Sequence, residues 1–192
     1  MPTKVTESEE SAETWAAKAV VPHDLREAIA HAQILLVPTE GYGDRQDLVF
    51  FPAGTSELFR FLKDRTASDI NIEVAATDDS YCEVARHADV MYLTAFLLNA
   101  VLAPIFARLL SEYILMRVGR HKSSTKIKTS VTLRDDVTQR SARLDYEGSA
   151  TAFSDAVVTV AKQLQSGEAL TTPDDSIGYP ELDHSVPSEV PR

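Results

Sequence analysis

Two groups of acidic residues are the candidates for chemistry in this sequence. Glu40, Tyr42 and Asp44 lie in a glycine-containing loop after a continuous apolar run, and Asp78 and Asp79 follow a second extended segment. Paired carboxylates can bind a divalent cation or act as general acid and base. Ligands of open α/β sheets bind beyond the carboxyl ends of the strands. The two groups therefore predict a small enzyme or ligand-binding protein with an acidic cleft, provided that their strands are neighbours.

Each group also has an interpretation that involves no ligand. The G-Y-G of the first loop matches neither the dinucleotide-binding fingerprint nor the Walker loop, and a flexible turn explains it more simply. The second group, Asp78-Asp79-Ser80, is typical of a turn that leads into a capped helix. No further ligand with a diagnostic spacing accompanies either group, so we predict no metal and no cofactor.

Cys82 is the only cysteine, which excludes an intramolecular disulfide framework and a multi-cysteine zinc site. A nucleophilic Cys–His pair needs its imidazole within hydrogen-bond reach of the sulfur. His87 follows too far along the predicted helix to share a face with Cys82. No G-x-S-x-G elbow is present either. We therefore expect a role other than catalysis.

The run from Arg117 to Lys128 is basic and contains no acid. Such a run could contact phosphates or anionic lipid. No aromatic residue interleaves it, so stacking on single-stranded nucleic acid is unsupported. The simpler interpretation is a solvated loop followed by the wet face of a strand, on which Lys128 pairs with Glu147.

Alternating extended and helical patterns predict the elements that position these residues. Continuous apolar runs or strict alternation indicate strands, and apolar residues at helical spacing indicate helices. The predicted strands are 33–38, 48–52 and 69–75, and the predicted helices are 24–32, 55–65 and 150–164. Ser80-Tyr-Cys-Glu83 has the spacing of a capping box and predicts the start of another helix.

Residues 125–134 and 140–147 are predicted to form a hairpin with one register. In that register apolar pairs share one face: Leu133 with Ala142, Val131 with Leu144, and Thr129 with Tyr146. The other face is polar and complementary in charge: Thr132 with Arg143, Ser130 with Asp145, and Lys128 with Glu147. A slip of one residue would turn every side chain to the wrong face, so the pattern defines the pairing.

Residues 90–107 are the most unusual segment, because no charge interrupts them between Asp89 and Arg108. Their length reaches the lower limit of a membrane span, and basic residues follow, so a single-pass anchor is one interpretation. Asn99 and Pro104 weaken insertion, and we predict instead a long core helix over about 89–118, kinked or split at Pro104. Its scattered polar positions indicate burial from several directions, by the fold or by a second subunit.

The net charge of −10 lies mostly at the ends of the chain, with −3 in residues 1–14 and −5 in residues 166–192. Both ends are predicted to be disordered acidic tails around a single domain at 15–165. An acidic balance argues against nucleic-acid binding. The absence of an apolar leader and the single thiol predict a cytoplasmic location.

The predicted fold class is α/β, a two-layer α/β sandwich with a mixed sheet of about five strands and a long central apolar helix. Strand 69–75, the long helix and strand 125–134 are expected to form a right-handed crossover. Several strands have a polar side, so part of the sheet should lack a covering helix. We expect a cytoplasmic interaction or assembly domain that self-associates or binds a protein partner. The acidic-cleft protein and the membrane-anchored protein remain the alternatives.

Overall fold

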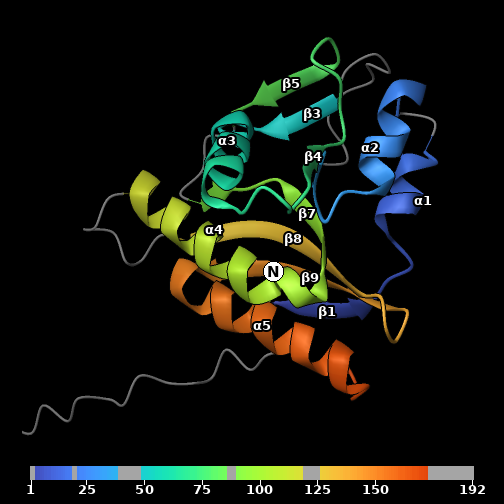
Figure 1. Cartoon of the computed structure of the whole chain (residues 1–192). Helices are drawn as coiled ribbons and strands as arrows, with labels where there is room; N and C mark the ends of the chain where they lie inside the picture. Colours follow the sequence, from blue (N-terminus) through green and yellow to red (C-terminus); the bar gives the residue numbers. More distant parts are fainter. Residues whose placement is uncertain (1–2, 19–20, 39–48, 86–89, 119–125, 173–192) are drawn as a thin grey trace, which may run out of the picture.

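The computed structural model describes residues 3–18, 21–38, 49–85, 90–118 and 126–172 (Figure 1). Strands and helices alternate along these residues, with two short 3-10 turns at His23–Leu25 and Ala100–Leu102. The strands are β1 (Lys4–Glu7), β2 (Ile34–Val37), β3 (Val49–Pro52), β4 (Ile72–Val74), β5 (Tyr81–Val84), β6 (Val90–Tyr92), β7 (Ala95–Asn99), β8 (Lys126–Asp135) and β9 (Arg140–Ser149). The helices are α1 (Ala12–Ala16), α2 (Arg26–Ala30), α3 (Thr55–Arg65), α4 (Ala103–Val118) and α5 (Ala150–Ser166).

A mixed sheet in the order β1-β9-β8-β7-β2-β4 forms the centre of the fold, and β6 adds to β8 as its seventh strand. This confirms the predicted α/β class, with a larger sheet than the five strands expected. Strands β3 and β5 form a separate parallel pair. The crossover that contains the long helix joins β7 to the parallel strand β8, so the prediction that it starts from strand 69–75 is wrong.

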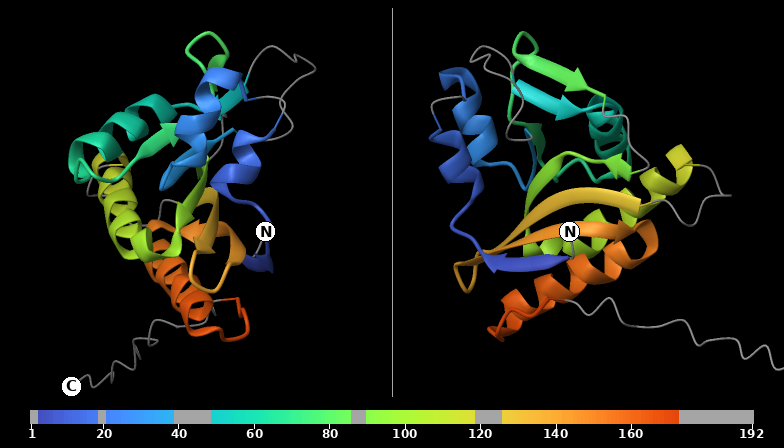
Figure 2. Two further views of the ribbon diagram at one scale, coloured as in Figure 1. Left: turned by 45° about the vertical axis from the view of Figure 1, so that its right-hand side comes forward. Right: turned by 180° about the vertical axis from the view of Figure 1, so that it is seen from behind.

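Helices α3, α4 and α5 cover one face of the sheet and bury the main core (Figure 1). Phe106 of α4 packs edge-on against Phe96 of β7, and Phe153 of α5 packs in the same way against Tyr146 of β9. On the other face, α1 and α2 cover the β7-β2-β4 side of the sheet, where Trp15 lies in a second, smaller core. None of the described helices lies over the opposite face of β8 and β9, as the two views of Figure 2 show.

The β8–β9 hairpin has the register that its alternation predicts. Leu133 pairs with Ala142 and Val131 with Leu144, and all four side chains are fully buried beneath the helices. Lys128 pairs with Glu147 on the opposite face, and its amine lies 2.9 Å from the carboxylate. The strong contrast between the two faces determines the pairing here, because any slip would bury charge.

Residues 90–107 do not form the predicted helix. They form β6, β7, a 3-10 turn and the start of α4, and among the described residues no helix is long and apolar enough to cross a membrane. Strand β7 lies between β2 and β8 with side chains buried on both faces, and such a strand has the same continuous apolar composition as a buried helix. Pro104 lies in the first turn of α4, where its missing N–H costs no helical hydrogen bond.

Ser80–Glu83 does not begin a helix. Ser80 closes a turn with Thr77 through side-chain and backbone hydrogen bonds, and Tyr81–Val84 form strand β5 beside β3. The residues taken as a capping box therefore stabilise a turn, since Ser and Thr side chains compete for both local structures. The N-terminal residues also differ from expectation, because Lys4–Glu7 form the edge strand β1 rather than part of a disordered tail.

The N-terminus of helix α3 is capped by Glu83, a residue of strand β5. Its N-cap is Gly54, which has a φ of 88° and provides no side chain. The Glu83 carboxylate of β5 accepts hydrogen bonds from the backbone N–H groups of Gly54 and Ser56, each at 2.7 Å. Burial would raise the pKa of Glu83, but the bonds from Tyr81, Ser56 and Gly54 outweigh it and lower the pKa to about 2.

Replacing Glu83 with glutamine is expected to lower the free energy of unfolding by about 1 kcal/mol at neutral pH, because the helix loses a charged cap. The carboxylate has a lower pKa when folded than the usual 4.5. Its contribution is therefore complete above pH 4.5 and is lost as the pH falls toward 2. Urea unfolding across this range should show the two proteins converging in stability at low pH. Glu57→Gln, an exposed change in the same turn, should alter stability little at any pH.

Candidate functional site

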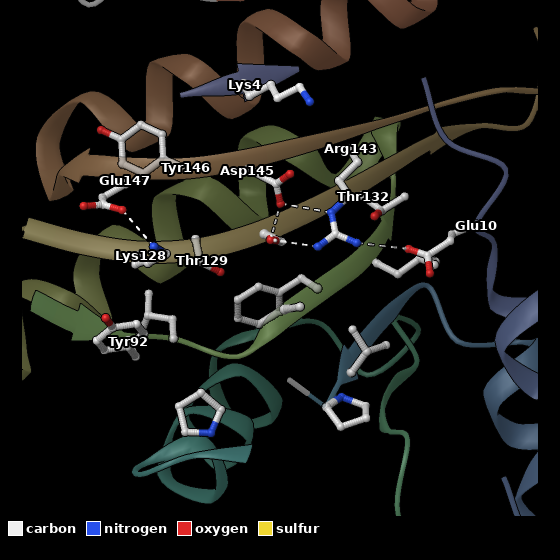
Figure 3. Close-up of a pocket in the computed structure, with 18 of the residues that line it drawn as sticks. Lys4, Glu10, Tyr92, Lys128, Thr129, Thr132, Arg143, Asp145, Tyr146 and Glu147 are labelled. Atoms are coloured by element: carbon white, nitrogen blue, oxygen red, sulfur yellow. Dashed lines mark hydrogen bonds and ion pairs between the residues drawn. The ribbon is translucent and has the colours of Figure 1, made fainter. Parts of the chain in front are cut away.

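A cavity of about 700 Å³ lies against the face of β8 and β9 that no helix covers. We call it the sheet-face pocket (Figure 3). Its floor consists of side chains from β8, β9 and β1, and its walls come from α1, the ends of β2 and β3, and the β6–β7 segment. The hairpin register determines which side chains reach this space, because alternate residues of a strand point to opposite faces.

Charged and hydroxyl side chains form a row across the floor of the pocket. We define the polar row as Lys128 and Ser130 of β8 with Arg143, Asp145 and Glu147 of β9. The Ser130 hydroxyl donates to the Asp145 carboxylate, and Arg143 reaches the same carboxylate at 2.9 Å. Arg143 also lies 3.3 Å from the Ser130 hydroxyl. Figure 3 shows Arg143 beside Asp145, with Lys128 and Glu147 paired farther along the same two strands.

Two residues from the N-terminal segment extend the polar row. Lys4 of β1 lies opposite Asp145 in the antiparallel register, and the Glu10 carboxylate lies 4.0 Å from Arg143. The described lining residues thus include three basic and three acidic side chains. Opposite charges neighbour each other along the row, so its described side chains are balanced in charge.

The carboxylates of the polar row are stabilised in their charged form. Burial raises the pKa of Asp145, but hydrogen bonds from Ser130 and Arg143 outweigh it and lower that pKa below its ordinary value. The hydrogen bond from Lys128 lowers the pKa of Glu147. At neutral pH the row is therefore a set of ion pairs rather than a source or acceptor of protons.

The wall that faces the polar row is largely apolar. It includes Val37, Pro38, Pro52, Tyr92, Leu93, Leu97 and Trp15. Trp15 is buried, and its indole N–H has no hydrogen-bond partner among the described residues. The Lys18 amine lies 3.3 Å from the centre of its ring. Trp15 therefore contributes the surface of its ring to the wall, while its N–H is shielded from the cavity.

The predicted acidic cleft is only partly within the described structure. Asp78 and Asp79 lie exposed in the turn between β4 and β5, and neither lines the sheet-face pocket. Glu40, Tyr42 and Asp44 lie outside the described residues, so their proximity to Asp78 and Asp79 stays a prediction. Within the described residues, no three His, Cys, Asp or Glu side chains are grouped so that they could hold a metal ion.

The other candidates from the sequence lie in separate places. Cys82 is a half-buried free thiol on β5, and His87 lies outside the described residues. Arg117, at the start of the basic run, donates to the Tyr113 hydroxyl at 2.6 Å and pairs with Glu57. Lys128, at its end, belongs to the polar row. Residues 119–125 lie outside the described residues.

Sequence reasoning identified the pairs of the polar row but not the pocket. The predicted register placed Ser130 beside Asp145 and Lys128 beside Glu147 on an open face, and this was the available signal. No pattern in the sequence predicted the walls of the pocket. Trp15 and Tyr92 reach the pocket only through tertiary contacts between distant segments.

Comparison of the chain with models of known protein families, with curated proteins and with solved structures found no match. The geometry of the sheet-face pocket is therefore the basis for assigning a function.

Proposed function

We propose that this protein binds a small amphipathic organic molecule in the sheet-face pocket. The observation that carries the proposal is a cavity of about 700 Å³ with an apolar wall opposite a short row of fixed polar groups. Cavities of roughly 300–1,000 Å³ with this division of surfaces are typical of small-molecule sites. The proposed function is binding rather than catalysis, because the polar row is internally paired.

The pocket has one apolar side and one polar side, so we expect a ligand with an apolar body and a polar group. The apolar body would lie against Tyr92, Leu93 and Pro52, where contact with water is lost on binding. The polar group would face the row on β8 and β9. Because the described charges balance, an uncharged polar group fits better than an ion, which would lose its hydration without a matching counter-charge.

The interaction role expected from the sequence does not compete with this function. A protein partner or second copy could bind the helical layer, because α4 and α5 lie on the opposite face of the sheet from the pocket. We also propose a cytoplasmic location, which the free thiol of Cys82 supports.

Energy transfer from the single tryptophan tests the proposal directly. Trp15 is the only tryptophan in the chain and lines the pocket. The uncharged probe N-phenyl-1-naphthylamine absorbs where tryptophan emits and brightens in apolar surroundings. Titrating the full chain with this probe should quench Trp15 and increase probe emission with saturation at one probe per chain. A signal that never saturates, or no transfer at all, would refute binding in this pocket.

Opposite substitutions in one ion pair should change the charge preference of the pocket in opposite directions. Lys128→Gln and Glu147→Gln break the same contact but leave the row more negative and more positive, respectively. Octanol, octanoate and octylammonium share one tail and can be compared by displacement of the probe. We expect Lys128→Gln to favour octylammonium and Glu147→Gln to favour octanoate, each by about fivefold relative to octanol. A common effect in both variants would contradict the prediction, because loss of the ion pair alone would then explain it.

A further inference from the structure

Helix α4 exposes an apolar stripe on the side that faces away from the sheet. Ile105, Leu115 and Met116 are 48%, 51% and 55% exposed, and Val101 of the preceding turn is 64% exposed. Large apolar side chains grouped on one surface are typical of interaction sites in soluble proteins. Along α4 the opposite side is fully buried against the core, for example at Phe106 and Leu110, so the helix is apolar on both sides.

The stripe has the spacing of a helix-pairing seam. Val101, Ile105, Arg108, Glu112 and Leu115 follow one another at intervals of four, three, four and three residues. This alternation keeps side chains on one face and lets them interlock with a neighbouring helix. The apolar residues lie toward the ends of the seam, and its centre holds one basic and one acidic residue.

The two charges make the seam complementary to itself. If a second copy of α4 lies antiparallel and crosses midway between Arg108 and Glu112, Arg108 of one helix meets Glu112 of the other. The same arrangement places Ile105 opposite Leu115 and Pro104 opposite Met116. Every contact then occurs twice, as a two-fold interface requires. Arg108 is exposed, and Glu112 already accepts a bond from Arg65 at 2.6 Å, which orients its carboxylate.

We propose that two copies of this chain associate through α4, antiparallel about a two-fold axis, with reciprocal Arg108–Glu112 ion pairs between apolar ends. The proposed occupant of the stripe is a second copy, because the exposed Arg108 and the Glu112 four residues later face their opposites when α4 pairs antiparallel with itself. The inference is independent of the sheet-face pocket, which lies on the other side of the sheet. A seam of one 16-residue helix is about 24 Å long, so a weak dimer is expected, with a dissociation constant of about 10 µM.

Charge reversal tests this register in the full chain by sedimentation velocity. Arg108→Glu places four acidic residues at the centre of the dimer, and Glu112→Arg places four basic ones there. Each single variant should therefore associate at least about tenfold more weakly than the natural chain. Mixing the two single variants should restore association, because a mixed pair regains both opposite-charge contacts. The double variant Arg108→Glu/Glu112→Arg should dimerise within about threefold of the natural chain.

Association in the mixture would show that each single variant dimerises poorly because of charge repulsion and not because it is misfolded. Two misfolded variants would not restore each other's association. Unfolding curves of each single variant provide a second check, because Glu112→Arg also removes the contact with Arg65. A natural chain that stays monomeric at about 100 µM, ten times the expected dissociation constant, would overturn the proposal. Single variants that dimerise as tightly as the natural chain, or a mixture that fails to associate, would also overturn it.

Discussion

Replacing Phe106 with alanine is expected to lower the free energy of unfolding by about 3–5 kcal/mol. Phe106 is fully buried at the start of α4, where its ring meets the edge of Phe96 at a centroid distance of 4.8 Å. The substitution removes the buried ring and leaves a cavity beneath the strand that the sequence had suggested was helical. Urea denaturation followed by far-UV circular dichroism measures the loss.

The neighbouring residue provides the matched control. Ile105→Ala changes an exposed side chain on the same turn and should cost less than about 0.5 kcal/mol in dilute solution, where the chain is monomeric. If Ile105 and Phe106 proved equally sensitive, α4 would not present one side to the core and the other to solvent. A large effect at Phe106 alone would confirm that residues 90–107 contribute to the core of a folded domain.

Replacing Ser130 with phenylalanine is expected to weaken binding of N-phenyl-1-naphthylamine by at least about 100-fold. Ser130 lies in the middle of the polar row, where its hydroxyl contacts Asp145 and Arg143. A phenyl group there would occupy the space proposed for the ligand and separate the paired charges. Energy transfer from Trp15 measures the change without a label on the protein.

A phenylalanine introduced far from the pocket should not weaken binding of the probe. Ala152→Phe adds a ring at an exposed position on α5, on the other side of the sheet, and should change probe affinity by less than about twofold. Unfolding curves for both variants would show whether the chain remains folded. Unchanged affinity in a folded Ser130→Phe protein would contradict binding over the polar row.

The hairpin was predictable from sequence because its two faces differ strongly in polarity. Leu133 and Val131 could be buried only if Ser130 and Lys128 faced the other way, so one register satisfied every pair. The last helix was predictable for a similar reason, since Phe153 and Val157 recur at helical spacing and are fully buried.

Strand β7 and the cap of α3 were not predictable in this way. A strand buried on both faces has no alternation, and the Phe96–Leu98 run fits a helix equally well until its partners are known. Glu83 reaches the start of α3 from a strand that is distant in sequence. The walls of the sheet-face pocket also form through tertiary contacts between distant segments. Only the polar row could be predicted, because it follows from the register of one hairpin.

Strand β1 pairs with β9, a strand far along the chain. Lys4–Glu7 pair with Ala142–Asp145, so β9 must leave the ribosome before β1 can dock. Until then the outer edge of β9 has no neighbour, and the segment that carries Glu10 and Trp15 is not anchored by β1. The binding site is therefore a late product of folding, completed only when the two ends of the domain meet.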